Sequence, residues 1–298
     1  MCEVKRVLAL ALCVAVAAQG GLARGWQSVA AGPPQAEARV DVGGRRLNIK
    51  CSGVGAVGAP TVILESGFGN SSGVWERVQP EVAKFARVCS YDRAGLGGSD
   101  PAPTPRTVVA VTEDLHALLT NAKVPGPYVL VGHSLGGLLA RLYASYYPSE
   151  VAGMVLVDSA HEDEADRGVA LIPPDTLKAM LKAAKPSDLV VSHPNESLDL
   201  CSMRALMEAL NWHADIPLVV LTQGVPYRAE DYANPALAPK YYQLHLEMQR
   251  DLVGRSPRGR QVIAERSGHF IHQDQPELVV NAIRQVFEEV KSKNSGHR

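Results

Sequence analysis

Gly132-His133-Ser134-Leu135-Gly136 is the stretch that decides the fold, because of what lies on either side of it. The run before it, 128–131, is apolar and rich in β-branched residues, as in a buried strand. The run after it, 137–144, has a helical pattern that stops at Pro148. A serine flanked by glycines between a strand and a helix is typical of a strained turn that presents a nucleophile. The sequence therefore predicts Ser134 as a catalytic serine, and the alternative is a glycine-rich structural turn.

The composition is that of an ordinary globular protein. The chain has 298 residues, of which 46% are hydrophobic and 20% charged, with a net charge of −1. This is ample for one large core. A charge near zero argues against nucleic acid or an anionic membrane as the main partner.

Residues 1–23 have the layout of an export signal. Lys5 and Arg6 precede a short apolar run, 7–18, that ends in small residues. Such a run is short for a membrane span and typical of a secretory signal peptide. The candidate cleavage sites follow Ala17, Ala18 and Ala23. We therefore expect a secreted or periplasmic protein without stable membrane insertion of the mature chain, with an uncleaved anchor as the alternative. Residues 24–37 are expected to be a linker.

From residue 38 onward, predicted strands alternate with helices after an opening hairpin around Gly43-Gly44. The predicted strands are 38–42, 46–51, 61–65, 87–91, 128–131, 153–157, 217–221 and 261–264. This alternation requires a mostly parallel sheet with helices on both faces. The predicted core comprises 38–160 and 214–293, and its last helix, 276–290, is amphipathic.

Residues 161–213 interrupt the alternation. This segment begins with an acidic run, 162–164, and contains helical stretches at 175–185 and 203–210, without a strand of comparable quality. An insertion at this end of the sheet is expected to lie above Ser134 as a cap or lid.

A serine hydroxyl needs a general base, and His269 is the favoured candidate. It follows a glycine on a loop after the last strand, at the same edge of the sheet as Ser134. His272 is the rival, although it lies beyond the apex of that loop. His133 has its backbone in the turn and cannot aim its ring at Ser134, so we expect it to pack or to shape the pocket.

Attack by a serine also needs two backbone amides to stabilise the oxyanion. One is expected from Leu135, the residue after the nucleophile. The second is expected from Phe68, in the glycine-rich loop 66–69 after the strand 61–65. The alternative for this loop is a turn without a catalytic role.

These motifs resemble the α/β-hydrolase superfamily, and the resemblance covers everything after about residue 38. Ser66-Gly67 stands where a histidine-glycine pair is common, and with Glu65 before it this variant looks like an esterase- and lipase-like branch. The stretch 91–99 matches the D-x-R-G-x-G-x-S loop of that family loosely, with Ala94 where glycine is usual. The resemblance implies an α/β fold with an eight-stranded, mostly parallel sheet, a small helical cap insertion, and the chain order serine, acid, histidine.

The triad acid departs from the family pattern. The family usually places it in a G-x-x-D turn after the strand that here is 217–221, but this chain has no acid there until Glu230 and Asp231. Asp158 lies directly at the end of the strand 153–157, the position that some lipases of this fold use. A carboxylate at a strand end needs little loop to reach the imidazole, so Asp158 is favoured, with Asp231 and Glu230 as alternatives. A helix N-cap is the structural alternative for Asp158.

The cysteines bear on the same resemblance. It implies that the strand 46–51 neighbours the strand 87–91, and neighbouring strands lie about 5 Å apart, which suits a disulfide. We therefore predict a Cys51–Cys89 bridge, which export would permit, and a free Cys201 in the cap.

Together these residues predict a secreted serine hydrolase that cleaves carboxylic esters without a cofactor or a metal ion. Ser134 attacks, His269 takes its proton, and water clears the acyl-enzyme with the same base. Asp92 and Arg93 are expected to hold their loop by an ion pair and hydrogen bonds. Alternatives are thioesterase, peptidase or carbon–carbon bond hydrolase chemistry, or a non-catalytic ligand-binding protein of this fold. The expected partner is a small-molecule ester, and nothing in the sequence points to an oligomeric state.

Overall fold

The computed structural model describes residues 36–295, apart from residues 57, 184–190, 194–195, 200–205, 207–211 and 232–233. The predicted export signal, Cys201 and most of the linker 24–37 lie outside the described residues. The helix predicted at 203–210 also lies outside them, apart from Leu206.

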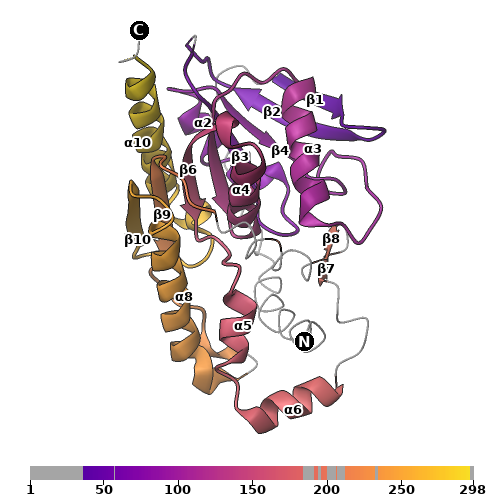
Figure 1. Cartoon of the computed structure of the whole chain (residues 1–298), viewed down its shortest axis with the longest axis vertical. Coiled ribbons are helices and arrows are strands. Elements are labelled where there is room, and N and C mark those ends of the chain that lie inside the picture. The colour runs from indigo at the N-terminus through magenta and orange to yellow at the C-terminus, as the bar shows by residue number, and fades with distance from the viewer. Residues whose placement is uncertain are drawn as a thin grey trace, which may run out of the picture.

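The centre of the fold is an eight-stranded sheet in the order β1-β2-β4-β3-β5-β6-β9-β10 (Figure 1). Its strands are β1 (Ala36–Asp41), β2 (Arg46–Ser52), β3 (Thr61–Glu65), β4 (Val88–Tyr91), β5 (Tyr128–His133), β6 (Val151–Val157), β9 (Leu218–Gln223) and β10 (Gly259–Ala264). β2 pairs antiparallel with both β1 and β4, and all other neighbours are parallel. The predicted eight-stranded, mostly parallel α/β fold is confirmed. The first strand begins two residues before the predicted residue 38, because Ala36 and Glu37 already pair with β2.

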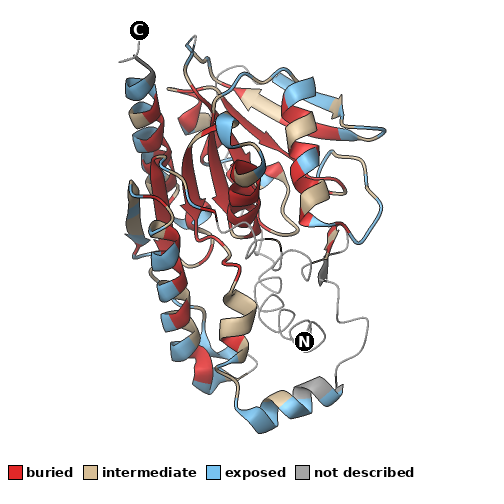
Figure 2. Cartoon of the chain, in the orientation of Figure 1, coloured by how far each residue is buried: buried red, intermediate tan, exposed pale blue. Residues whose placement is uncertain are grey.

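The central strands are buried on both faces. In β5, Val129 and Val131 contribute to one apolar cluster, together with α2 (Gln79–Val82) and α10 (Pro276–Ser295). Leu130 faces the other cluster, which α3 (Val108–Asn121), α4 (Leu135–Tyr146) and α8 (Ala238–Val253) cover. Figure 2 shows the strands as a buried layer between these helices. Alternate side chains therefore enter two cores, which is why these strands are apolar throughout.

The predicted disulfide is confirmed. Cys51 on β2 lies directly opposite Cys89 on β4 in the antiparallel register, and the two are joined. The bridge fastens the antiparallel hairpin to the parallel part of the sheet.

Four described elements between β6 and β9 lie beyond one end of the sheet (Figure 1). They are α5 (Glu164–Val169) and α6 (Pro174–Ala183), and a strand pair, β7 (Val191–His193) with β8 (Glu196–Leu198). The strand pair was not predicted, because the expected cap insertion was helical. β8 is held by the core, because the Arg106 amide donates to the Ser197 carbonyl at 2.9 Å. Strands of three residues are too short to leave a periodic pattern.

The remaining helices are short. A 3-10 turn η1 (Ser72–Trp75) precedes α2. The others are η2 (Pro148–Glu150), η4 (Ala229–Asp231), η5 (Pro235–Leu237) and α9 (Ile271–Asp274). Across the described part of the chain, no helix has both the length and the apolar character that a bilayer crossing requires.

Candidate active site

The candidate site lies at the carboxyl ends of three adjacent parallel strands, β5, β6 and β9. His133 pairs with Val157, and Val157 pairs with Leu221, so the three strands end at one level. The Ser134 amide donates to the Val157 carbonyl at 3.1 Å, and the Asp158 amide donates to the Leu221 carbonyl at 2.8 Å. Ser134 and Asp158 are therefore fixed side by side by the sheet itself.

Ser134 occupies a strained turn. Its φ is +53° and its ψ is −121°, a conformation that costs a non-glycine residue about 1–3 kcal/mol. The flanking glycines are required by close approach. A Cβ on Gly132 would lie 2.4 Å from the Gly136 carbonyl oxygen, and a Cβ on Gly136 would lie 2.3 Å from the Glu65 carbonyl oxygen. The turn can form only with glycine at both positions, as the sequence pattern predicts.

His269 is held by Asp158. The Nδ1–H of His269 donates to Oδ2 of Asp158 at 2.7 Å, and both side chains are buried. This bond fixes the tautomer in which Nε2 carries the lone pair. Nε2 of His269 is itself buried and has no hydrogen-bond partner among the described residues. The ring is therefore arranged to accept a proton at the edge of the sheet that presents Ser134.

The second carboxylate oxygen of Asp158 also has partners. Oδ1 accepts from the Gln223 amide and from Nε2–H of His245, each at 2.9 Å. Burial alone would raise the pKa of Asp158, but the charges and hydrogen bonds of His245 and His269 outweigh it and lower that pKa. Asp158 is therefore an anion that accepts hydrogen bonds from two histidines.

Sequence reasoning missed His245, because it left α8 unassigned. The available signal was the spacing of Leu244, Met248 and Leu252, which recur every fourth residue on the buried face of that helix. That pattern predicts the helix, but it does not predict that a histidine beside the apolar stripe reaches a residue 87 positions earlier.

The rival base His272 lies in the core instead. Its ring packs on Trp75 with centroids 4.9 Å apart and, like that of His133, is fully buried. Burial, followed by the nearby His269, lowers the pKa of His272 to about 3. His133 does not act on Ser134 directly, because its Nε2–H donates to the His269 carbonyl at 3.0 Å. His133 thereby supports the backbone of the loop that carries His269, which agrees with its expected packing role.

The loop 66–69, predicted to supply an oxyanion amide, passes beside the nucleophile. A Cβ built on Gly67 would lie 3.4 Å from the Cβ of Ser134. Phe68 packs against an apolar cluster that includes Leu135, the first residue of α4. The amides of a first helical turn have no partner within the helix, so that of Leu135 can serve an oxyanion. The structure thus brings Leu135 and the loop 66–69 together at the Ser134 turn.

Arg93 holds that loop in place. Its guanidinium donates to the carbonyls of Ser66 at 2.6 Å and Gly67 at 2.7 Å. It also pairs with the buried carboxylates of Glu65 at 2.7 Å and Glu196 at 2.6 Å. Both pairs lie out of solvent, and Glu196 belongs to β8 in the cap. Arg93 therefore ties the loop to the cap as well as to the core.

Glu196 and Asp92 complete this support. The Gly69 amide donates to Glu196 at 2.7 Å, so the cap carboxylate touches the loop directly. The Ser72 and Gly98 amides donate to Asp92 at 2.7 and 2.9 Å. The structural roles expected of Asp92 and Arg93 match these contacts, although the ion pairs of Arg93 are with Glu65 and Glu196.

The alternative acids do not meet His269 in the same way. Glu230 is exposed and lies 3.5 Å from Arg228. The side chain of Asp231 lies outside the described residues, and its backbone is part of η4. Of the acids that the structure describes here, Asp158 is the one bonded to His269.

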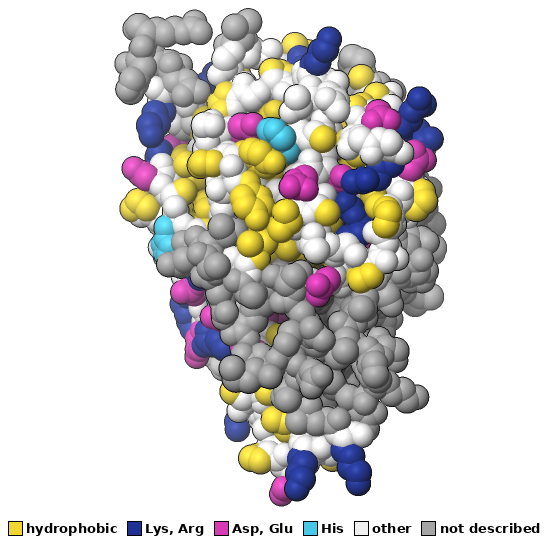
Figure 3. Space-filling view, turned by 45° about the vertical axis from the view of Figure 1, so that its right-hand side comes forward, with side chains coloured by type: hydrophobic (Ala, Val, Ile, Leu, Met, Phe, Trp, Pro, Cys, Tyr) yellow, Lys and Arg dark blue, Asp and Glu magenta, His cyan; other side chains and the backbone are white. Residues whose placement is uncertain are grey.

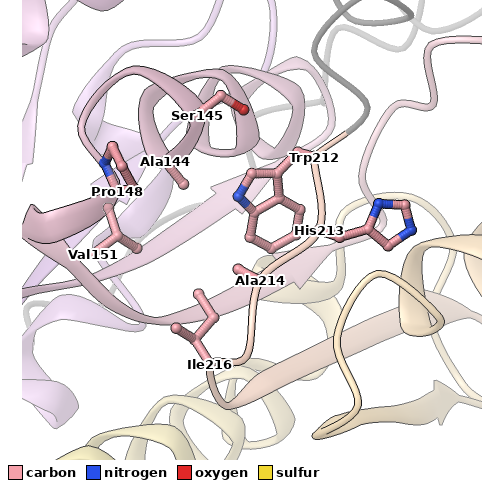
Figure 4. A pocket seen from close by; sticks show the side chains of 8 residues that line it. All are labelled: Ala144, Ser145, Pro148, Val151, Trp212, His213, Ala214 and Ile216. Carbon is pink, nitrogen blue, oxygen red and sulfur yellow. The ribbon is translucent and has the colours of Figure 1, made fainter.

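A pocket of about 320 Å³ lies near the amino ends of β6 and β9, at the opposite end of these strands from Ser134 (Figure 4). Ala144, Ser145, Pro148, Val151, Trp212, His213, Ala214 and Ile216 line it. These residues belong to the last turn of α4, the start of β6 and the segments just before β6 and β9, so the pocket is separate from the Ser134 site. Within the described ranges, no group of three or more His, Cys, Asp or Glu side chains is placed to hold a metal ion. On the face in Figure 3, acidic and basic side chains are interspersed.

Comparisons with known proteins agree with this geometry. Residues 60–290 match a protein family described as the alpha/beta hydrolase fold. The uncharacterized protein YqjL of Bacillus subtilis is 30% identical over 227 residues, which are 76% of this chain and 83% of that protein. Other curated relatives match over shorter stretches, and the chain spans between 15% and 18% of the length of three of them.

Solved structures show the same fold at low identity. Alpha/beta hydrolase domain-containing protein 10 from mouse has a TM-score of 0.61 and 17% identity, covering 86% of this chain and 99% of that one. A thermophilic esterase from Thermogutta terrifontis has a TM-score of 0.58 and 21% identity, with the same coverage of 86% and 99%. The sheet order, the strained serine turn and the family match lead to one conclusion: the chain belongs to the α/β-hydrolase family.

Proposed function

We propose that the protein is an exported serine hydrolase that cleaves carboxylic esters, with Ser134 as nucleophile, His269 as base and Asp158 as the acid. The observation that carries the proposal is the state of the His269 ring. Nδ1 is bonded to the Asp158 carboxylate at 2.7 Å, while Nε2 has no hydrogen-bond partner among the described residues. Such a ring, on the strand edge that presents a strained serine, is arranged for general-base catalysis.

The proposed reaction has two halves. Oγ of Ser134 attacks the ester carbonyl while Nε2 of His269 takes its proton, and the Asp158 carboxylate stabilises the imidazolium. The amides of Leu135 and Phe68 stabilise the oxyanion. His269 then gives the proton to the departing alcohol, which leaves an acyl group on Ser134. Water activated by the same ring releases the acid and restores the serine.

Esters are the proposed substrates for two reasons. The structural neighbour from Thermogutta terrifontis is described as an esterase. The site also offers the serine, base and amide donors that acyl transfer from oxygen to water requires. Thioesters, amides and carbon–carbon bonds use the same groups and are the outcomes to test next if esters fail.

The test is hydrolysis of p-nitrophenyl esters of increasing acyl length by the wild type and Ser134→Ala. The matched control is Ser145→Ala, on the same helix, where the hydroxyl donates to the Arg141 carbonyl at the far end. We expect turnover by the wild type and the control, and none above background with Ser134→Ala. Equal rates for all three proteins would contradict the proposal.

Export is proposed on separate grounds. The basic pair and apolar run at the N-terminus support it, and so does the Cys51–Cys89 disulfide, because such bridges persist in oxidising compartments. Cell fractionation followed by N-terminal sequencing tests it. A start at residue 18, 19 or 24 is expected, and secreted material that begins at Met1 would contradict cleavage.

A further inference from the structure

We propose that His245 is a positioning residue of this site: it holds the second oxygen of Asp158 and sets the pH range in which His269 works as a base. The inference rests on the proposed function, since it concerns the same acid and base. It assigns a role to a residue that lies outside the serine, histidine and acid of the proposed reaction.

The geometry around Asp158 is that of one carboxylate shared by two histidines. His269 bonds Oδ2 at 2.7 Å, and His245 bonds Oδ1 at 2.9 Å. The Asp158 side chain is 0% exposed and that of His245 is 17% exposed. The Gln223 amide already bonds Oδ1, so the backbone and His269 alone would satisfy both oxygens. His245 adds a donor whose charge changes near neutral pH.

Helix α8 is built to present His245 at this point. Tyr242, one turn earlier, donates to the Gly224 carbonyl at 2.9 Å. Gln249, one turn later, donates to the Ser159 carbonyl at 2.8 Å. Residues three and four apart lie on one face of a helix, so the three side chains form a row that faces the site. The bonds of Tyr242 and Gln249 fix the helix on both sides of His245, so its ring has little freedom to turn away from Asp158.

The charges around His245 favour its protonated form. The groups that act on it are Asp158, from the end of β6, and Glu164, from α5. Burial lowers the pKa of His245, but the charge and hydrogen bond of Asp158 outweigh burial and raise it. Burial, followed by the charge of Asp158, raises the pKa of Tyr242 on the same helix.

Other charged groups on the neighbouring elements are paired elsewhere. Arg167 of α5 bonds Glu247 at 2.6 Å. His161, on the loop after β6, lies 3.1 Å from Asp251. The charged groups that act on His245 are therefore the acids Asp158 and Glu164.

Two histidines on one carboxylate compete for its charge. A proton on His245 partly neutralises Asp158 and opposes a second positive charge on His269. His269 therefore keeps its free Nε2 down to a lower pH than it would beside an uncharged donor. Without the charge on His245, acid should inactivate the enzyme at a higher pH.

The test compares the pH profiles of kcat/KM for the wild type and His245→Gln, which keeps an N–H donor but takes no proton. We expect the acidic limb to move up by about one pH unit, with the plateau changed less than about threefold. The matched control is His116→Gln, whose ring stacks on Tyr147 and lies 3.5 Å from Glu150 on the far side of the fold. Its profile should overlay that of the wild type. A lower plateau with an unmoved limb would mean a merely structural role and would overturn the proposal.

A second measurement needs neither turnover nor a stable variant. Titration of the histidine ring protons of the wild type by NMR should show His245 and His269 as a coupled pair, each reporting both protonation steps. Independent single titrations in the wild type would overturn the proposal. If no ester is hydrolysed, this titration still decides the role of His245, so the two failures remain distinguishable.

Discussion

Replacing Arg93 with methionine should strongly destabilise the protein. The Arg93 side chain is 2% exposed and pairs with Glu65 and Glu196, whose side chains are 4% and 3% exposed. Methionine fills much of the same volume without the charge. The variant therefore keeps two buried carboxylates and removes their shared cation.

The size of the effect follows from that imbalance. Removing one partner of a buried ion pair typically costs about 3–5 kcal/mol, because the charge that remains is neither solvated nor paired. Here two carboxylates are left, and the carbonyls of Ser66 and Gly67 also lose their donor. We expect the free energy of unfolding to fall by about 5 kcal/mol at neutral pH.

The loss should depend on pH with a definite sign. In the wild type, burial raises the pKa of Glu65, whereas Arg93 outweighs burial at Glu196 and lowers its pKa. Without Arg93, both folded-state pKa values should lie above their unfolded values. Such groups stabilise the fold when protonated, and that contribution is lost as pH rises through the folded pKa. The difference between wild type and variant should therefore be smaller in mild acid than in mild base.

Urea unfolding at two pH values tests this, followed by the fluorescence of Trp75, which is buried and bonded to Ser66. A companion variant that combines Arg93→Met with Glu65→Gln and Glu196→Gln removes all three charges and should recover part of the loss. A difference below about 1 kcal/mol, or one that grows in acid, would refute the reasoning.

Three further predictions concern the site and the sheet. Replacing Cys51 and Cys89 with serine opens a loop of 38 residues and should lower the free energy of unfolding by about 4 kcal/mol, measured in urea without reductant. Asp158→Asn should lower kcat about a thousandfold or more, because the amide no longer stabilises the imidazolium. Glu230→Gln is its control, and a fall in kcat with Glu230→Gln alone would favour Glu230 as the triad acid. Gly67→Ala should lower kcat at least tenfold in ester assays, since the added Cβ would lie 2.9 Å from Nδ1 of His133 and displace the loop. An unchanged kcat would mean that this loop does not stabilise the oxyanion.

The sequence predicts the features that rest on local patterns. The central strands are predicted because they are short apolar runs, and the first hairpin because of its Gly43-Gly44 turn. The Ser134 turn is predicted because its strand, its glycines and its helix are consecutive in the sequence. His269 was found because its glycine loop follows a strand, and its bond to Asp158 agrees with a carboxylate at a strand end. Each of these depends on where parallel strands end, which the order of elements determines.

The parts that escaped prediction depend on contacts between distant residues. Glu196 lies 103 positions from Arg93, and a glutamate in a three-residue strand carries no sign of that partner. The strand pair β7–β8 exists because the core binds β8, so its propensity was decided by tertiary contact. The role of His245 depends on the packing of α8 against β9, and no local sequence pattern specifies that contact.

The backbone at the site has a consequence for how this chain can evolve. Ser134 and Asp158 both have positive φ, at +53° and +43°, where glycine is far more comfortable. Ser134→Gly should therefore make the protein about 1 kcal/mol more stable, even after the greater freedom of glycine in the unfolded chain is counted. Selection for hydrolysis and selection for stability act in opposite directions at this residue. A lineage that no longer needed the reaction would gain a sturdier fold by its first mutation there, and lost activity in such descendants should coincide with higher melting temperatures.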